Sequence, residues 1–179
     1  CCRVVLRQLL APVKIDAAEV DTLPRDVRVL LSGLEALHSM SDAVVTIDCR
    51  DGGAPFRFLL TQACVLPSRR VRFVGTDRLG ERPHGPLLAS LRNALGGAGL
   101  SIQEGNPWPI EVASPKQSLS NIQFNVTGVE SSQFASSLLL GAARVAHSSR
   151  RGCSVRLEGP MTSEGYFELT RAWLVRAGF

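Results

Sequence analysis

Three consecutive polar side chains, Ser131, Ser132 and Gln133, open an otherwise apolar stretch that continues through Leu138-Leu-Leu140. Serine is a common N-cap residue, so a serine at a helix start is ordinary. Two hydroxyls and an amide at that position also lie where free backbone N–H groups and the helix dipole favour an anion. Capping needs only one of the three residues. The pattern alone therefore leaves two interpretations, a helix cap and a phosphate site.

Arg82 is the second residue whose type and position could bind an anion. It precedes Pro83 at the start of a predicted helix over residues 82–95. A guanidinium can bind a carboxylate or phosphate with two parallel hydrogen bonds. A cation beside the positive end of a helix dipole is unfavourable unless an anion lies nearby. The position favours an anion site over the alternative, a surface arginine without a ligand.

Composition indicates one globular domain over residues 1–179. The 179 residues are 45% hydrophobic and 20% charged, which is enough to build a core. Mean hydropathy is +0.10, and no apolar run approaches the roughly 18 residues of a membrane span. Aromatic residues make up 6%, and the basic residues form isolated pairs rather than a stripe, so neither nucleic acid nor membrane is an expected partner.

The cysteines and histidines do not form a metal-binding pattern. Five cysteines lack a C-x-x-C spacing, and the three histidines are scattered. We therefore predict no metal and no cofactor, and a reducing, cytoplasmic location.

Strands and helices are predicted to alternate along the chain. Helical periodicity or caps indicate helices over residues 23–38, 54–65, 82–95, 131–147 and 166–177, and short apolar runs indicate strands over residues 43–48, 70–74, 100–102, 110–112, 122–126 and 153–157. The order suggests an α/β (α+β) domain in which a unit of about 60 residues is repeated. No dinucleotide-binding or Walker sequence occurs, so a nucleotide-binding fold has little support.

Several segments, in this order, resemble the first half of the 5-enolpyruvylshikimate-3-phosphate synthase family, the 3-phosphoshikimate 1-carboxyvinyltransferases. Cys49-Arg-Asp-Gly-Gly-Ala-Pro-Phe-Arg-Phe-Leu59 resembles the family's Asn-Ala-Gly-Thr-x-x-Arg segment, and Gly75-Thr-Asp-Arg-Leu-Gly-Glu-Arg-Pro-His-Gly-Pro-Leu87 is similar to its Arg-x-x-x-Arg-Pro segment. Ser131-Ser-Gln-Phe134, the later Ser163-Glu-Gly-Tyr166 and the helix start Arg25-Asp-Val-Arg28 complete the resemblance. Their shared order covers nearly the whole chain.

The resemblance implies a fold and a reaction. Each half of the family enzyme is built from β-α-β-α-β-β units with helices packed inward, and the active site lies between the two halves. The enzyme transfers enolpyruvyl from phosphoenolpyruvate to the 5-hydroxyl of shikimate-3-phosphate. The second half supplies the catalytic carboxylate and lysine. The implied partners of this chain are therefore both substrates and a second half, and the chain alone is expected to be inactive.

The resemblance also implies roles for individual residues. Ser131, Ser132 and Gln133 match contacts of shikimate-3-phosphate, and Arg82 matches a contact of phosphoenolpyruvate. Further matched positions that bind substrate are Ser163, Tyr166, Arg3 and Gly53. Glu164-Gly165 replaces a Lys/Arg-Pro of the family, which puts a negative charge near the expected phosphate. The lysine and serine that precede the family's first arginine are absent before Arg3.

The turn before the second predicted helix departs most from the family. Asp51 stands in place of an amide and Ala54 in place of a threonine. Asp51 would repel phosphoenolpyruvate unless paired with Arg50, Arg57 or Arg82. Gly53 still allows close approach of a ligand to the backbone. Arg57 is expected to be a structural ion-pair residue.

Two alternatives remain open from the sequence. One is a diverged, non-catalytic domain that keeps the fold and binds a protein or ligand, which Asp51 and Ala54 favour. The other is the sister transferase that acts on a UDP-amino sugar. That family places a reactive cysteine in a loop near the position of Arg82, and no cysteine occurs between Cys64 and Cys153.

Overall fold

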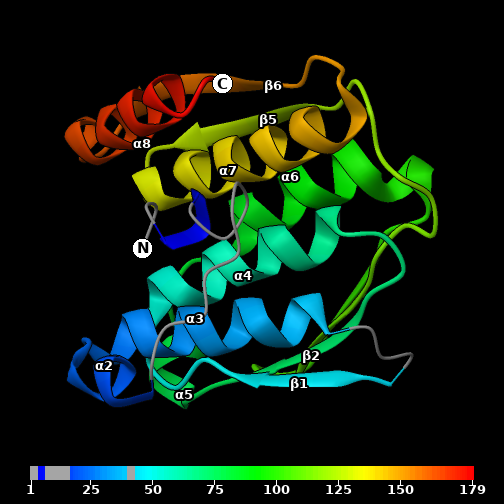
Figure 1. Cartoon of the computed structure of the whole chain (residues 1–179). Helices are drawn as coiled ribbons and strands as arrows, with labels where there is room; N and C mark the ends of the chain where they lie inside the picture. Colours follow the sequence, from blue (N-terminus) through cyan, green and yellow to red (C-terminus); the bar gives the residue numbers. More distant parts are fainter. Residues whose placement is uncertain (1–3, 7–16, 40–42) are drawn as a thin grey trace.

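The computed structural model describes residues 4–6, 17–39 and 43–179 (Figure 1). Arg3, one of the predicted site residues, lies outside these ranges. The remaining predicted site residues all lie within them.

Two sheets form the framework. The first has the strand order β1-β2-β4-β3, and the second pairs β5 with β6. β1 runs parallel to β2, β4 runs antiparallel to both β2 and β3, and β5 runs parallel to β6. The strands are β1 (Val45–Asp48), β2 (Arg70–Val74), β3 (Ser101–Glu104), β4 (Ile110–Ala113), β5 (Gln123–Gly128) and β6 (Ser154–Met161).

Helices precede, connect and follow these strands. In the described part of the chain they are α2 (Ala17–Thr22), α3 (Arg25–His38), α4 (Gly53–Val65), α5 (Asp77–Gly80), α6 (Gly85–Leu95), the 3₁₀ helix η1 (Gly96–Ala98), α7 (Ser132–Ser149) and α8 (Glu164–Arg176). Figure 1 shows α4 and α7 between the β5–β6 sheet and the four-stranded sheet. The mixed α/β fold class predicted from the sequence is confirmed.

The repeated unit is visible in the connectivity. Strands and helices β1-α4-β2-α6-β3-β4 form one β-α-β-α-β-β unit, into which the short α5 is inserted. β5-α7-β6-α8 then repeats its first four elements, again with a parallel strand pair joined through a helix. The unit is longer than the sequence suggested, because it spans residues 45–113 and the next strand begins at Gln123.

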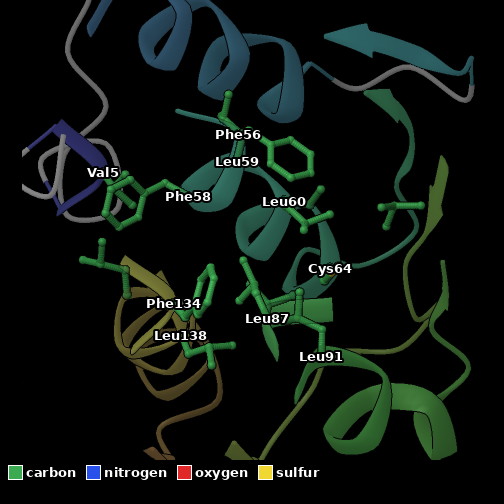
Figure 2. Packing of buried hydrophobic residues seen from close by; sticks show 14 of the residues in the cluster. Val5, Phe56, Phe58, Leu59, Leu60, Cys64, Leu87, Leu91, Phe134 and Leu138 are labelled. Carbon is green, nitrogen blue, oxygen red and sulfur yellow. The ribbon is translucent and has the colours of Figure 1, made fainter. Parts of the chain in front are cut away.

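α4 is the central helix. Apart from Ala54, all of its residues are buried, and these include the polar Arg57, Thr61 and Gln62 among the apolar side chains. Figure 2 shows Phe56, Phe58, Leu59 and Leu60 leaving this helix in different directions towards its neighbours. Burial on all sides confirms that this helix is packed inward.

The third predicted helix begins later than the sequence suggested. α6 starts at Gly85, so Arg82 lies in the loop after α5 and not at a helix start. A proline disfavours helical geometry in the residue before it. Pro83 follows Arg82 and therefore keeps Arg82 outside the helix. Pro86 occupies the first turn, where a missing N–H costs nothing. The helix-dipole argument for an anion near Arg82 therefore does not apply.

Gly141 lets α7 approach α4 closely. A Cβ atom at this position would lie 2.6 Å from Cγ2 of Thr61. Gly141→Ala is therefore expected to lower the free energy of unfolding by about 1–3 kcal/mol, measured by urea denaturation. Gly85→Ala is the matched control, because its added Cβ meets no atom within 4 Å. An equal loss of stability in both variants would contradict the tight contact.

Candidate functional site

A cavity of about 460 Å³ lies where the N-terminal turns of α4, α7 and α8 meet. Its walls are Ala54, Phe58, Glu130, Ser131, Ser132, Gln133, Ser136, Thr162, Ser163, Tyr166, Leu169 and Trp173. The two predicted clusters, residues 131–133 and the pair Ser163 and Tyr166, therefore line the same cavity. Residues from the first turns of three helices, where free backbone N–H groups favour an anion, therefore line one cavity.

The two serines at the start of α7 differ in role: one is the helix cap, and the other is available as a ligand contact. Ser131 is the N-cap, and its Oγ accepts a hydrogen bond from the Gln133 N–H at 3.2 Å. Ser132 is only 4% exposed and lines the cavity. Its hydroxyl forms no hydrogen bond with any described residue and is available to a ligand. The cap interpretation therefore holds for Ser131, and Ser132 remains the candidate contact.

Two hydrogen bonds from Thr162 bring the second serine turn beside the first. The Thr162 N–H donates to the Gly128 carbonyl at 3.0 Å, and its Oγ1 donates to the Val129 carbonyl at 2.5 Å. Ser163, which follows, adopts a left-handed backbone (φ 56°) as it starts α8. The turns before α7 and α8 are thereby joined.

The negative charge beside the cavity comes from an unexpected residue. Glu164 is exposed and does not line the cavity, whereas Glu130 does. The concern that the sequence raised about Glu164 therefore applies to Glu130.

One face of α8 supplies an apolar wall. Tyr166, Leu169 and Trp173 are spaced three and four residues apart, so they share a face of the helix. Phe58 from α4 adds a further ring. Sequence reasoning identified Tyr166 alone, although the helical spacing of the other two could have indicated them. The cavity thus combines polar helix starts with apolar side walls.

Arg57 does not form, with any described residue, the ion pair that the sequence predicted. It is 6% exposed, and within the described residues it forms no ion pair, contrary to the expectation. Its Nη1 donates to Oε1 of Gln133 at 2.7 Å, and its Nη2 donates to the Pro83 carbonyl at 3.0 Å. Burial, and then the charge of Arg82, lower the pKa of Arg57 to about 10, so the side chain stays protonated at neutral pH.

Gly53 allows Arg82 to approach the start of α4. A Cβ atom on Gly53 would lie 2.7 Å from Nη1 of Arg82 and 3.5 Å from Nη1 of Arg57. Two cations thus face the same point of the backbone, next to Ala54 of the cavity wall. A side chain at this position would displace the Arg82 guanidinium.

Asp51 pairs with a different arginine. Its Oδ1 lies 3.6 Å from Nη1 of Arg25, and Arg50 instead pairs with Asp48 at 2.9 Å. Both side chains of the Arg25–Asp51 pair are exposed, so the pair contributes little to stability. None of the three partners considered from the sequence is used.

The described histidine, cysteine and acidic residues are dispersed, and two of the described cysteines are buried. No three of their histidine, cysteine, aspartate or glutamate side chains come together as a metal site. Burial raises the pKa of Cys49 to about 12 and also raises that of Cys64, so both thiols are protonated at neutral pH. None of the described helices has the length and apolar character needed to cross a membrane.

Comparison with known families gives one consistent match. The family model of EPSP synthase (3-phosphoshikimate 1-carboxyvinyltransferase) matches residues 8–178. A 3-phosphoshikimate 1-carboxyvinyltransferase of Methanoculleus marisnigri is 34% identical over 75% of this chain and 30% of that protein. One from Bordetella pertussis is 29% identical over 95% of this chain and 42% of that protein. The chain therefore spans less than half the length of these relatives.

A solved structure agrees in fold. EPSP synthase from Acinetobacter baumannii superposes with a TM-score of 0.60 at 16% identity, covering 93% of this chain and 40% of that one. At this identity the match supports the fold alone.

Proposed function

The chain belongs to the EPSP synthase (3-phosphoshikimate 1-carboxyvinyltransferase) family, and from this premise we propose that residues 1–179 are the shikimate-3-phosphate-binding half of a two-domain enzyme. The observation that carries the proposal is the meeting of residues 131–133 with Ser163 and Tyr166 in one cavity, beside two arginines that form no ion pair with a described residue.

In this proposal the cavity holds shikimate-3-phosphate. The hydroxyls of Ser132 and Ser163 bind its phosphate at the helix starts, where backbone N–H groups and dipoles favour an anion. Gln133 donates to an oxygen of the ligand, and Tyr166 covers its ring. Arg3, at the N-terminal end of the chain, is the remaining proposed phosphate contact.

Phosphoenolpyruvate is assigned to the region of Gly53 and Arg82. There Arg82, placed by Gly53, offers a guanidinium to its carboxylate or phosphate. The second half of the enzyme is the proposed partner that completes the site. Because proton transfer needs groups from both halves, the isolated chain binds but does not turn over. A cytoplasmic location is proposed, since the free thiols of Cys49, Cys64 and Cys153 suit a reducing compartment.

Titration calorimetry of the chain with shikimate-3-phosphate tests the proposal. Ser132→Ala is expected to weaken binding by about 10- to 100-fold, because a hydrogen bond to a charged group is lost. Ser148→Ala is the matched control on the same helix, since Ser148 bonds only to carbonyls of its own helix and lies outside the cavity. Absence of binding by the folded parent chain would contradict the assignment.

A diverged, non-catalytic domain is the second candidate. Ala54 and Glu130 in the cavity wall favour it, because the first offers no hydroxyl and the second repels a phosphate. Complementation of a strain that lacks the shikimate-pathway enzyme, with the full-length gene, separates the two: growth supports the enzyme, and its absence with normal expression supports the diverged domain.

A further inference from the structure

Arg57 joins three segments that are distant in sequence. It extends from α4, and its two hydrogen bonds reach Gln133 in the first turn of α7 and Pro83 in the loop before α6. Each partner is the chain neighbour of a proposed substrate contact, Ser132 in one case and Arg82 in the other. The planar guanidinium also packs over the ring of Phe134, 5.0 Å from its centre, which fixes its plane.

This contact determines which way the Gln133 amide faces. Arginine carries only donors, so the atom of Gln133 that meets Arg57 must be the oxygen. The NH₂ group is then left for the cavity, which Gln133 lines. A ligand in the cavity therefore meets a hydrogen-bond donor, the Gln133 NH₂ group. The ligand atom at this position must be an acceptor, such as an oxygen.

The electrostatic state of Arg57 does not favour a purely structural role. A buried cation without a carboxylate is costly, and the nearby charge of Arg82 adds to the cost. Arg144 shows that such burial alone is insufficient to indicate function. It is partly buried, burial lowers its pKa to about 10, and its Nε donates to Oε1 of Gln62, but neither residue lines the cavity.

We infer that Arg57 is a positioning residue that fixes the Gln133 amide as a donor towards the cavity and links it to the Arg82 segment. It contacts no ligand itself. The inference rests on the proposed function for the identity of the ligand, but not for the hydrogen-bond geometry.

The chain offers a matched pair of variants, because the Arg57–Gln133 and Arg144–Gln62 pairs both connect α4 with α7. Gln133→Glu gives Arg57 a carboxylate partner and removes the donor. Its melting temperature is expected to rise by about 3 °C, while affinity for shikimate-3-phosphate falls at least about tenfold. Gln62→Glu is expected to raise the melting temperature in the same way and leave affinity unchanged. Equal affinity of Gln133→Glu and the parent would overturn the inference.

Arg57→Lys tests positioning without relying on a ligand. Lysine keeps the charge but cannot bond both Gln133 and Pro83, so the side-chain amide signal of Gln133 in the ¹⁵N NMR spectrum of the free chain is expected to shift. Arg144→Lys should leave that signal in place. An unshifted Gln133 signal in folded Arg57→Lys would refute the positioning role. A shifted signal in this variant, together with no binding of shikimate-3-phosphate by the parent chain, would refute only the proposed function.

Discussion

Phe56→Ala is expected to lower the free energy of unfolding by about 3–5 kcal/mol, the largest stability effect of any single change considered. Phe56 is fully buried, with ring centres 5.6 Å from Phe73, 4.7 Å from His84 and 5.3 Å from Trp108. These rings come from β2, the loop before α6 and the loop before β4. Because they are held by separate segments, they cannot collapse together into the space that the phenyl ring leaves.

Urea denaturation measures this effect. Phe179→Ala is the matched control, since Phe179 is 36% exposed and its removal is expected to cost much less. A loss for Phe56→Ala no larger than that of the control would show that the aromatic cluster does not stabilise the fold. The cluster includes His84, which lies in the same loop as Arg82. Phe56→Ala is therefore also expected to disturb the loop that carries Arg82.

Acidification is expected to destabilise the chain through His84, by about 3 kcal/mol between pH 6.5 and pH 4. His84 is 7% exposed, and its Nε2–H donates to the Leu79 carbonyl at 2.9 Å, which leaves Nδ1 buried without a described partner. Burial, reinforced by the charges of Arg57 and Arg82, lowers its pKa from 6.5 to about 4.

The sign of this effect follows from the direction of the shift. Because the pKa is lower in the folded state, the unfolded chain binds a proton first as the pH falls below about 6.5. The contribution of His84 to stability is therefore fully present above that pH and is lost as the pH falls towards 4.

Free energies of unfolding measured from pH 7 to pH 4 check the prediction. His84→Gln keeps a donor for the Leu79 carbonyl but does not titrate, so its profile should be flatter. His38, whose pKa is also lowered by burial, remains in both proteins and contributes in the same direction. The relevant quantity is therefore the difference between the two profiles. Parallel profiles would contradict the role of His84.

The sequence determined the features that depend on residues close together in the chain. Helical periodicity predicted α3, and glycine with the following apolar residues predicted α4 within one residue of its start. The cap at Ser131 follows from local backbone geometry, as the sequence suggested. Motif order predicted the family and the fold class, because motifs survive where overall identity is low.

Only the tertiary structure decided how distant residues are paired. Asp51 pairs with Arg25, and Arg57 reaches Gln133 and Pro83 instead of a carboxylate. The serine turns before α7 and α8 are joined through Thr162, and α8 adds an apolar wall to the cavity. Spacing along the chain can indicate the apolar face of α8, but it carries no signal for what that face or the paired residues contact, since each contact depends on the relative placement of separate helices and loops. The polar triplet at the start of α7 was therefore recognisable from sequence, whereas the direction of its amide required the fold.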